Sequence, residues 1–174
     1  MNQNQFLDLN SLKLFKKKLS KPVKGIAIVT GGCGRIGSVF TSLFLYHGIS
    51  VIVLSKNKKN FLNYSSTLKP NLKKKLSWKK IDLKDPRSIE KIYNKIKNID
   101  IKYLVNNAAE NNRGEFYKYN YKVLNKELWG TFAGSMLLTE KVLNIMRKKK
   151  NGKIIFTGSL WGTRAPRSKI YKNL

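Results

Sequence analysis

The chain has 174 residues and 41% hydrophobic content, which suits one globular domain with a hydrophobic core. Its formal net charge of +27 resembles that of proteins that bind phosphate backbones through Lys and Arg. Only six of its 36 basic residues are arginines, however, and arginine is the side chain that binds phosphate through two parallel hydrogen bonds. Composition therefore favours other functions over nucleic-acid binding.

Simple counts argue against a membrane-spanning helix, an internal disulfide and a Cys/His metal site. No apolar run approaches the roughly 20 residues that a membrane-spanning helix needs. Cys33 is the single cysteine and His47 the single histidine, so the sequence offers no internal disulfide and no Cys/His cluster with metal-ligand spacing. We expect a soluble, cytoplasmic protein with no membrane partner and no metal site.

The chain divides into an extension and one domain. Residues 1–24 are polar at first and then place leucines among lysines until Pro22, so we treat them as an N-terminal extension. From residue 25 to 174, short β-branched runs alternate with helical patterns, which is typical of βαβ units. Strands are predicted over 26–30, 50–55, 76–82, 101–106 and 153–158. Helices are predicted over 35–46, 58–68, 86–97 and 121–149. This pattern predicts a doubly wound parallel α/β sheet of Rossmann type.

The helix predicted over 121–149 is the longest element. It carries apolar residues at 124, 128, 132, 138, 142 and 145. Trp129, Phe132 and Met136 recur at helical spacing, which favours a place in the core or at a subunit interface over a ligand-binding role.

Residues 30–37 read TGGCGRIG, directly after an apolar strand and directly before a helix. In that context one glycine makes the tight turn, a second lets the backbone approach a pyrophosphate, and a third lets the helix pack closely on the sheet. The free N–H groups at the helix start then meet the anion. The pattern predicts a dinucleotide-phosphate site at Gly31, Gly34, Arg35, Ile36 and Gly37.

Further signals follow at the ends of the later strands. Asp82 and Leu83 close the third predicted strand, residues 106–109 read NNAA after the fourth, and Ser159 follows the fifth. With the glycine turn, they make residues 25–159 resemble the short-chain dehydrogenase/reductase family. The resemblance implies a bound nicotinamide dinucleotide with its adenine ring beside Asp82 and Leu83. It also implies that the NNAA segment stabilises the sheet and lines the cofactor through Asn106, Ala108 and Ala109.

The end of the second predicted strand bears on the choice of cofactor. An NAD enzyme usually places a carboxylate there for the ribose hydroxyls, but this chain has Ser55 and Lys56. A hydroxyl followed by a cation can accept a 2′-phosphate. We therefore expect NADP, with NAD as the alternative.

The resemblance also implies the catalytic residues. In the family a serine, a tyrosine and a lysine four residues after the tyrosine carry the chemistry, because a nearby cation lets the phenol act at neutral pH. Ser159 takes the serine's place, and Tyr171, twelve residues later, is the candidate tyrosine. Residues 159–174 are also similar to a branch linked to flagellin modification and nonulosonic sugars, in which a tyrosine at this interval belongs to an insertion. Both interpretations of Tyr171 stay open. The family's relay asparagine is replaced by Glu127.

The leading hypothesis is an NAD(P)-dependent oxidoreductase that moves a hydride to or from a hydroxyl or carbonyl carbon of a small molecule, with a sugar or sugar derivative as one candidate substrate. Because family members run to about 250 residues, we expect this chain to be a fragment with an incomplete catalytic site, inactive alone, from a protein that forms a homo-oligomer. The alternatives are a non-catalytic dinucleotide-binding module and, in third place, a basic nucleic-acid-binding protein.

Overall fold

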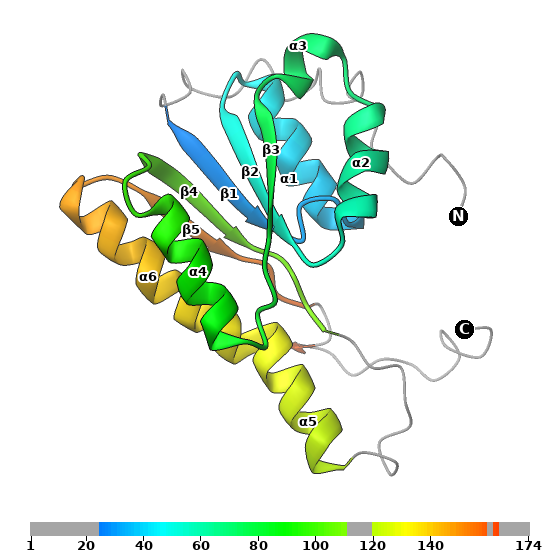
Figure 1. Ribbon diagram of the computed structural model, residues 1–174, viewed down its shortest axis with the longest axis vertical. Coiled ribbons are helices and arrows are strands. Elements are labelled where there is room, and N and C mark those ends of the chain that lie inside the picture. Colours follow the sequence, from blue (N-terminus) through cyan, green and yellow to red (C-terminus); the bar gives the residue numbers. More distant parts are fainter. Residues whose placement is uncertain (1–24, 111–119, 160–161, 164–174) are drawn as a thin grey trace.

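The computed structural model describes residues 25–110, 120–159 and 162–163. In this part of the chain five parallel strands form one sheet in the order β3-β2-β1-β4-β5 (Figure 1). The strands are β1 (Ile26–Thr30), β2 (Ser50–Ser55), β3 (Leu76–Lys80), β4 (Ile101–Asn106) and β5 (Lys153–Phe156). The helical segments are α1 (Arg35–Tyr46), α2 (Lys58–Ser66), α3 (Pro70–Lys73), α4 (Pro86–Ile96), α5 (Tyr121–Glu127), the π-helical segment η4 (Leu128–Ala133) and α6 (Gly134–Lys148). The predicted parallel α/β fold is confirmed, and the extension 1–24 lies outside the described residues.

Helices cover both faces of the sheet, α1 and α2 on one and α4 and α6 on the other (Figure 1). Successive residues of a strand point to opposite faces. In β1, Ile28 therefore joins the cluster of α4 and α6, whereas Ala27 and Val29 join the cluster of α1 and α2. Since both faces are buried, the central strands are apolar runs without a polar side.

The bounds of β1, β2, β4 and α1 agree with the sequence prediction, but the third and fifth strands end earlier. β3 ends at Lys80, because the N–H of Asp82 donates to Ser88 Oγ at 2.9 Å and its carboxylate accepts from the N–H of Lys84 at 3.0 Å. These bonds turn the chain away from the sheet. β5 ends at Phe156, although the N–H of Thr157 still donates to the carbonyl of Asn106 at 3.0 Å.

Two of the predicted helices are shorter than expected. α2 ends at Ser66, and the short helix α3, which begins at Pro70, was not predicted. α4 ends at Ile96, one residue before the predicted limit. Pro70 and Pro86 each stand in the first turn, where the missing N–H costs no hydrogen bond.

The helix predicted over 121–149 is present as a helical run from Tyr121 to Lys148, but it contains the π-helical segment η4, which was not predicted. A π turn holds about one residue more than an α turn, and one residue corresponds to about 100° of rotation. The apolar positions therefore do not form one face. Leu138, Val142 and Ile145 are buried against the sheet, whereas Leu124, Leu128 and Phe132 are 57%, 51% and 60% exposed. Met136 is also exposed, so Phe132 and Met136 do not belong to the core.

Neither a membrane-spanning helix nor a metal-binding cluster is present among the described residues. None of the helices found there is long and apolar enough to cross a bilayer. The same residues hold no group of three or more His, Cys, Asp or Glu side chains placed to bind a metal ion.

Candidate functional site: a crevice at the carboxyl ends of the strands

A cavity of about 480 Å³ opens at the carboxyl ends of β1, β2 and β4. The strand order reverses at β1, because the chain runs from β1 outward to β3 and then returns to β4 on the other side. Such a switch point leaves a crevice between loops that depart to opposite faces. The lining includes nine of the predicted cofactor residues, namely Gly31, Gly34, Arg35, Ile36, Ser55, Lys56, Leu83, Ala108 and Ala109.

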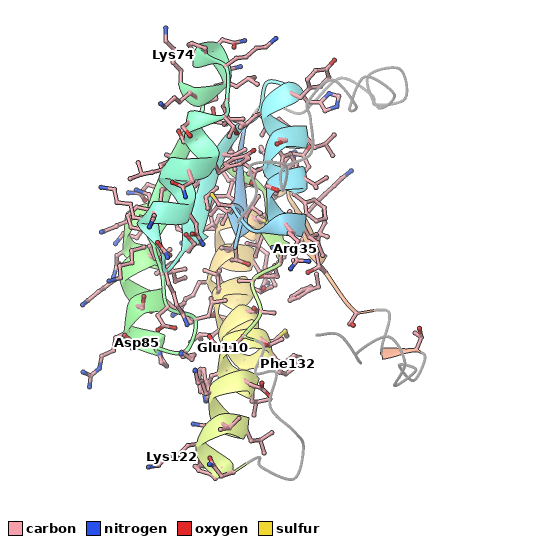
Figure 2. All side chains as sticks on the ribbon, turned by 90° about the vertical axis from the view of Figure 1, so that its right-hand side faces the viewer. Arg35, Lys74, Asp85, Glu110, Lys122 and Phe132 are labelled. Atoms are coloured by element: carbon pink, nitrogen blue, oxygen red, sulfur yellow. The ribbon has the colours of Figure 1, made fainter. Side chains whose placement is uncertain are left out.

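The glycine turn forms the floor of the crevice. The N–H of Gly31 donates to the carbonyl of Leu54 at 2.8 Å, which continues the β1–β2 ladder into the turn. Gly31 has a φ of 62°, in the left-handed region that favours glycine. α1 begins at Arg35 directly behind the turn, and Arg35 is exposed at the helix start (Figure 2). Ile36 is exposed as well. The free N–H groups of this first turn make it suitable for an anion.

Gly34 and Gly37 have different roles. A Cβ at Gly34 would meet a single atom of the protein, the carbonyl oxygen of Gly31, in a tight contact of 3.3 Å. A Cβ at Gly37 would overlap the same oxygen and come within 2.7 Å of Asn107 Nδ2. Gly37 is buried and does not line the cavity. It therefore supports the turn from behind and, unlike Gly34, does not belong to the lining of the cavity, although the sequence placed it among the cofactor residues.

Thr30 and Asn107 fasten the turn to the end of β4. Thr30 Oγ1 accepts hydrogen bonds from the N–H groups of Asn107 and Ala108, at 2.9 and 3.0 Å. Asn107 Nδ2 donates to the carbonyl oxygens of Thr30 and Gly31, at 3.2 and 3.4 Å. Neither residue was among the predicted cofactor ligands, although both stand inside the TGGCG and NNAA motifs. Their role is to hold the two walls of the crevice at a fixed separation.

The first residue of the NNAA segment lies behind the site. Asn106 is buried, its Nδ2 donates to Thr139 Oγ1 at 2.8 Å, and its carbonyl accepts from Thr157 of the chain after β5. Asn106 Oδ1 is without a hydrogen-bond partner among the described residues. Asn106 does not line the cavity, so its contribution to the site is to join β4, β5 and α6.

Ser55 and Lys56 stand at the rim, at the end of β2. Ser55 Oγ accepts a hydrogen bond from Trp78 Nε1 at 2.9 Å, which leaves its own proton available for a ligand. Lys56 is engaged by carboxylates from elsewhere in the chain, with Nζ 2.9 Å from Glu110 Oε2 and 3.4 Å from Asp82 Oδ1. The second strand ends without a carboxylate, as the sequence shows, but two carboxylates reach that end in space.

Asp82 and Leu83 differ in their relation to the cavity. Leu83 is buried and lines it, together with Ile81. Asp82 does not line it and instead caps the turn after β3 and faces Lys56. The lining also includes residues outside the predicted set of cofactor residues: Leu54, Asn57, Asn60, Ile81, Glu110, Gly130 and Asn107, the last of which belongs to the NNAA segment. Asn57 and Asn60 could have been suspected, since they directly follow the predicted strand end.

Glu110 is the most connected charged residue of the site. In addition to Lys56, its carboxylate lies 3.7 Å from Lys84 Nζ and 3.5 Å from Lys126 Nζ. The hydrogen bond from Lys56 lowers the pKa of Glu110 below its usual range, and the charges of Lys84 and Lys126 act in the same direction against partial burial. Glu110 is therefore a carboxylate at neutral pH.

The structure describes only one of the two predicted catalytic residues, Ser159. Ser159 is exposed after β5, and its carbonyl accepts from the N–H of Gly162 at 3.0 Å. It does not line the cavity. Tyr171 lies outside the described residues. The structure thus brings nine of the predicted cofactor residues together around one cavity and leaves the catalytic assignments as predictions.

Cys33 belongs to the glycine turn, but its side chain is buried and its thiol resists ionisation. Burial raises the pKa of its thiol to about 12, so the thiolate that alkylating reagents need is almost absent at pH 8. We expect iodoacetamide at pH 8 to leave Cys33 of the folded chain unmodified and to modify it readily in 8 M urea. Intact-mass measurement reports both, and rapid labelling of the folded chain would contradict the burial of this thiol.

Comparison with known proteins places this geometry in a family. The family model described as short chain dehydrogenase matches residues 25–171. The chain belongs to the short-chain dehydrogenases, as its glycine turn and NNAA segment suggested.

Individual relatives agree with this assignment. The 3-oxoacyl-[acyl-carrier-protein] reductase FabG of Escherichia coli is 29% identical over 142 residues, which are 79% of this chain and 56% of that protein. An uncharacterized oxidoreductase of Schizosaccharomyces pombe is 28% identical over 141 residues, 78% of this chain and 44% of the relative. A short-chain dehydrogenase from Sphingobium yanoikuyae, solved in complex with NADPH, shares the fold with a TM-score of 0.72 at 18% identity, over 83% of this chain and 56% of that one. The chain spans about half the length of the curated relatives it matches.

Proposed function

We propose that the crevice binds NADP(H) and that the protein is an NADP-dependent oxidoreductase acting on a hydroxyl or carbonyl carbon of a small molecule. The proposal rests on one cavity that is lined by Gly34, by the start of α1, and by Ser55 and Lys56 at the end of β2. This lining offers a pyrophosphate the free N–H groups of a helix start, and it offers a 2′-phosphate a hydroxyl and a cation. The family supports the reaction class, and the NADPH in the Sphingobium yanoikuyae dehydrogenase is consistent with the cofactor.

The residues of the crevice would bind and orient the dinucleotide. The N–H groups at the start of α1 would receive the pyrophosphate, Leu83 and Ile81 would contact the adenine ring, and Ala108 and Ala109 would line the path toward the nicotinamide. When bound, the cofactor supplies or accepts the hydride. We retain Ser159 as the residue that would hold the substrate oxygen and Tyr171 as the candidate proton donor. Both assignments rest on the family pattern.

The cofactor preference can be tested with one substitution at the strand end. We expect Ser55→Asp to change the protein from NADP preference to NAD preference, because a carboxylate repels the 2′-phosphate and accepts hydrogen bonds from ribose hydroxyls. The ratio of the two dissociation constants, measured by calorimetry at one physiological salt concentration, should change about 100-fold or more, corresponding to about 3 kcal/mol.

Ser55→Ala is the matched control, because it removes the hydroxyl without adding a charge. It should weaken NADP binding only moderately. A wild-type chain that already binds NAD more tightly than NADP would contradict the proposed cofactor. Equal salt in every measurement is essential, since a chain of net charge +27 attracts anions at low ionic strength.

We further propose that the whole protein is a homo-oligomer of the cytoplasm. The support is the exposed apolar side chains on α5, η4 and α6, which are Leu124, Leu128, Phe132 and Met136. A face of this kind favours burial against another surface.

Sugars and sugar derivatives are the first substrates to test, because residues 159–174 resemble the branch linked to nonulosonic sugars.

A further inference from the structure

We propose that Glu110 is a specificity-determining residue that competes with the 2′-phosphate of the cofactor for Lys56. The inference rests on the proposed NADP site and adds a residue that works against it. The consequence is a preference for the phosphorylated cofactor that is lower than Lys56 would give without Glu110 beside it.

Lys56 already contacts two carboxylates. Its Nζ is 2.9 Å from Glu110 Oε2, close enough for a charge-assisted hydrogen bond, and 3.4 Å from Asp82 Oδ1. Lys56 and Glu110 both line the cavity. A 2′-phosphate that approaches Lys56 therefore meets a cation whose best partner position is already taken.

Glu110 is held in place by hydrogen bonds of its main chain. Its N–H donates to Thr131 Oγ1 at 3.0 Å, and Thr131 Oγ1 donates to its carbonyl oxygen at 3.0 Å. Gly130 lies against it, where a Cβ would come within 2.6 Å of Glu110 Cβ. The main chain of Glu110 is thus pinned to η4, so its carboxylate stays near the cavity when a ligand enters.

The carboxylate of Glu110 balances several positive charges. Among the described residues, Glu110 pairs with three lysines from three separate segments, Lys56, Lys84 and Lys126. In Figure 2, Glu110 lies below Arg35 in the middle of the molecule. A cofactor with a 2′-hydroxyl leaves the Lys56–Glu110 pair intact. A cofactor with a 2′-phosphate must draw Lys56 away from the carboxylate before it can pair with the cation.

The test uses the full chain and compares NADP⁺ with NAD⁺. We expect Glu110→Gln, which preserves shape and removes the charge, to raise the ratio of Kd for NAD⁺ to Kd for NADP⁺ about three- to tenfold, as expected for one charge acting through a solvated rim. Glu90→Gln is the matched control. Glu90 pairs with Lys141 between α4 and α6 and does not line the cavity, so its loss gives the same net charge without the local effect.

A double-mutant cycle shows whether Glu110 acts through Lys56. In the background of Lys56→Met, the Glu110→Gln substitution should change the ratio by less than about twofold, because the competing cation is gone. Glu110→Asp is a second variant that retains the charge on a shorter side chain, and its ratio should fall between those of the wild type and Glu110→Gln. Thermal unfolding followed by circular dichroism confirms that each variant is folded.

The outcomes separate this inference from the proposed function. If Glu110→Gln changes the ratio no more than Glu90→Gln does, or lowers it, the role of Glu110 is overturned although NADP binding stands. If its effect persists in the Lys56→Met background, competition for Lys56 is overturned. A wild-type chain that binds neither dinucleotide would overturn the proposed function itself.

Discussion

Replacing Gly34 with valine is expected to reduce dinucleotide affinity by at least about 100-fold, or about 3 kcal/mol, while the chain stays folded. Gly34 lines the cavity, and a Cβ built there meets only the carbonyl oxygen of Gly31 at 3.3 Å. The valine side chain would therefore extend into space that the protein leaves open. In the proposed cofactor site, that space is where the pyrophosphate would approach the N–H groups at the start of α1. Titration calorimetry with NADP⁺ measures the loss.

Gly37→Val is the informative contrast to this variant. Its Cβ would overlap the carbonyl oxygen of Gly31 and press on Asn107 Nδ2, so the turn itself should not form. We expect Gly37→Val to lose both binding and stability, whereas Gly34→Val should unfold within a few degrees of the wild type. Dinucleotide binding by Gly34→Val at wild-type strength would remove the crevice from consideration as the cofactor site.

Thr30→Val is expected to lower the free energy of unfolding by about 2–4 kcal/mol, which is a large fraction of the total for a small domain. Valine has nearly the shape of threonine, so the packing changes little. The N–H groups of Asn107 and Ala108, however, lose the Oγ1 that accepts them at 2.9 and 3.0 Å. Two partly buried donors left without a partner cost more than the average hydrogen bond contributes. Urea unfolding measures the difference.

Thr30→Ser tests the explanation, because it restores the hydroxyl and removes only a methyl group. It should recover at least half of the stability that Thr30→Val loses. If valine and serine destabilise the chain equally, the hydroxyl is not what joins β1 to β4, and the role assigned to Thr30 is wrong.

The part of the site that could be predicted from sequence depends on backbone geometry. Gly31, Gly34 and Gly37 are informative because a left-handed φ, an open space and a close approach each exclude most side chains. The strands around them were recognisable because a sheet covered on both faces requires unbroken apolar runs. Nine of the predicted cofactor residues line one cavity as a result.

The features that sequence missed depend on contacts between distant segments. Lys56 and Glu110 are 54 residues apart, and in a chain with 36 basic residues no pattern marks which lysine meets which carboxylate. The π-helical turn at η4 was equally hidden, because its residues read as an ordinary helix. At this segment Gly134 packs against the carbonyl of Leu83 and Gly130 against Glu110, and both contacts join segments that are distant in the sequence.

The strand order has a consequence for how the crevice responds to its ligand. Its walls come from the segments that follow β1, β2, β3 and β4, which no short stretch of the chain contains. The crevice can therefore exist only when β1 is already paired on both sides, and an unfolded or half-formed sheet offers the ligand nothing equivalent. By mass action, a dinucleotide at 100 times its Kd would add about 2.7 kcal/mol to the stability of the folded state. That gain would apply to the sheet as a whole, so occupancy of the crevice and integrity of the fold rise and fall together.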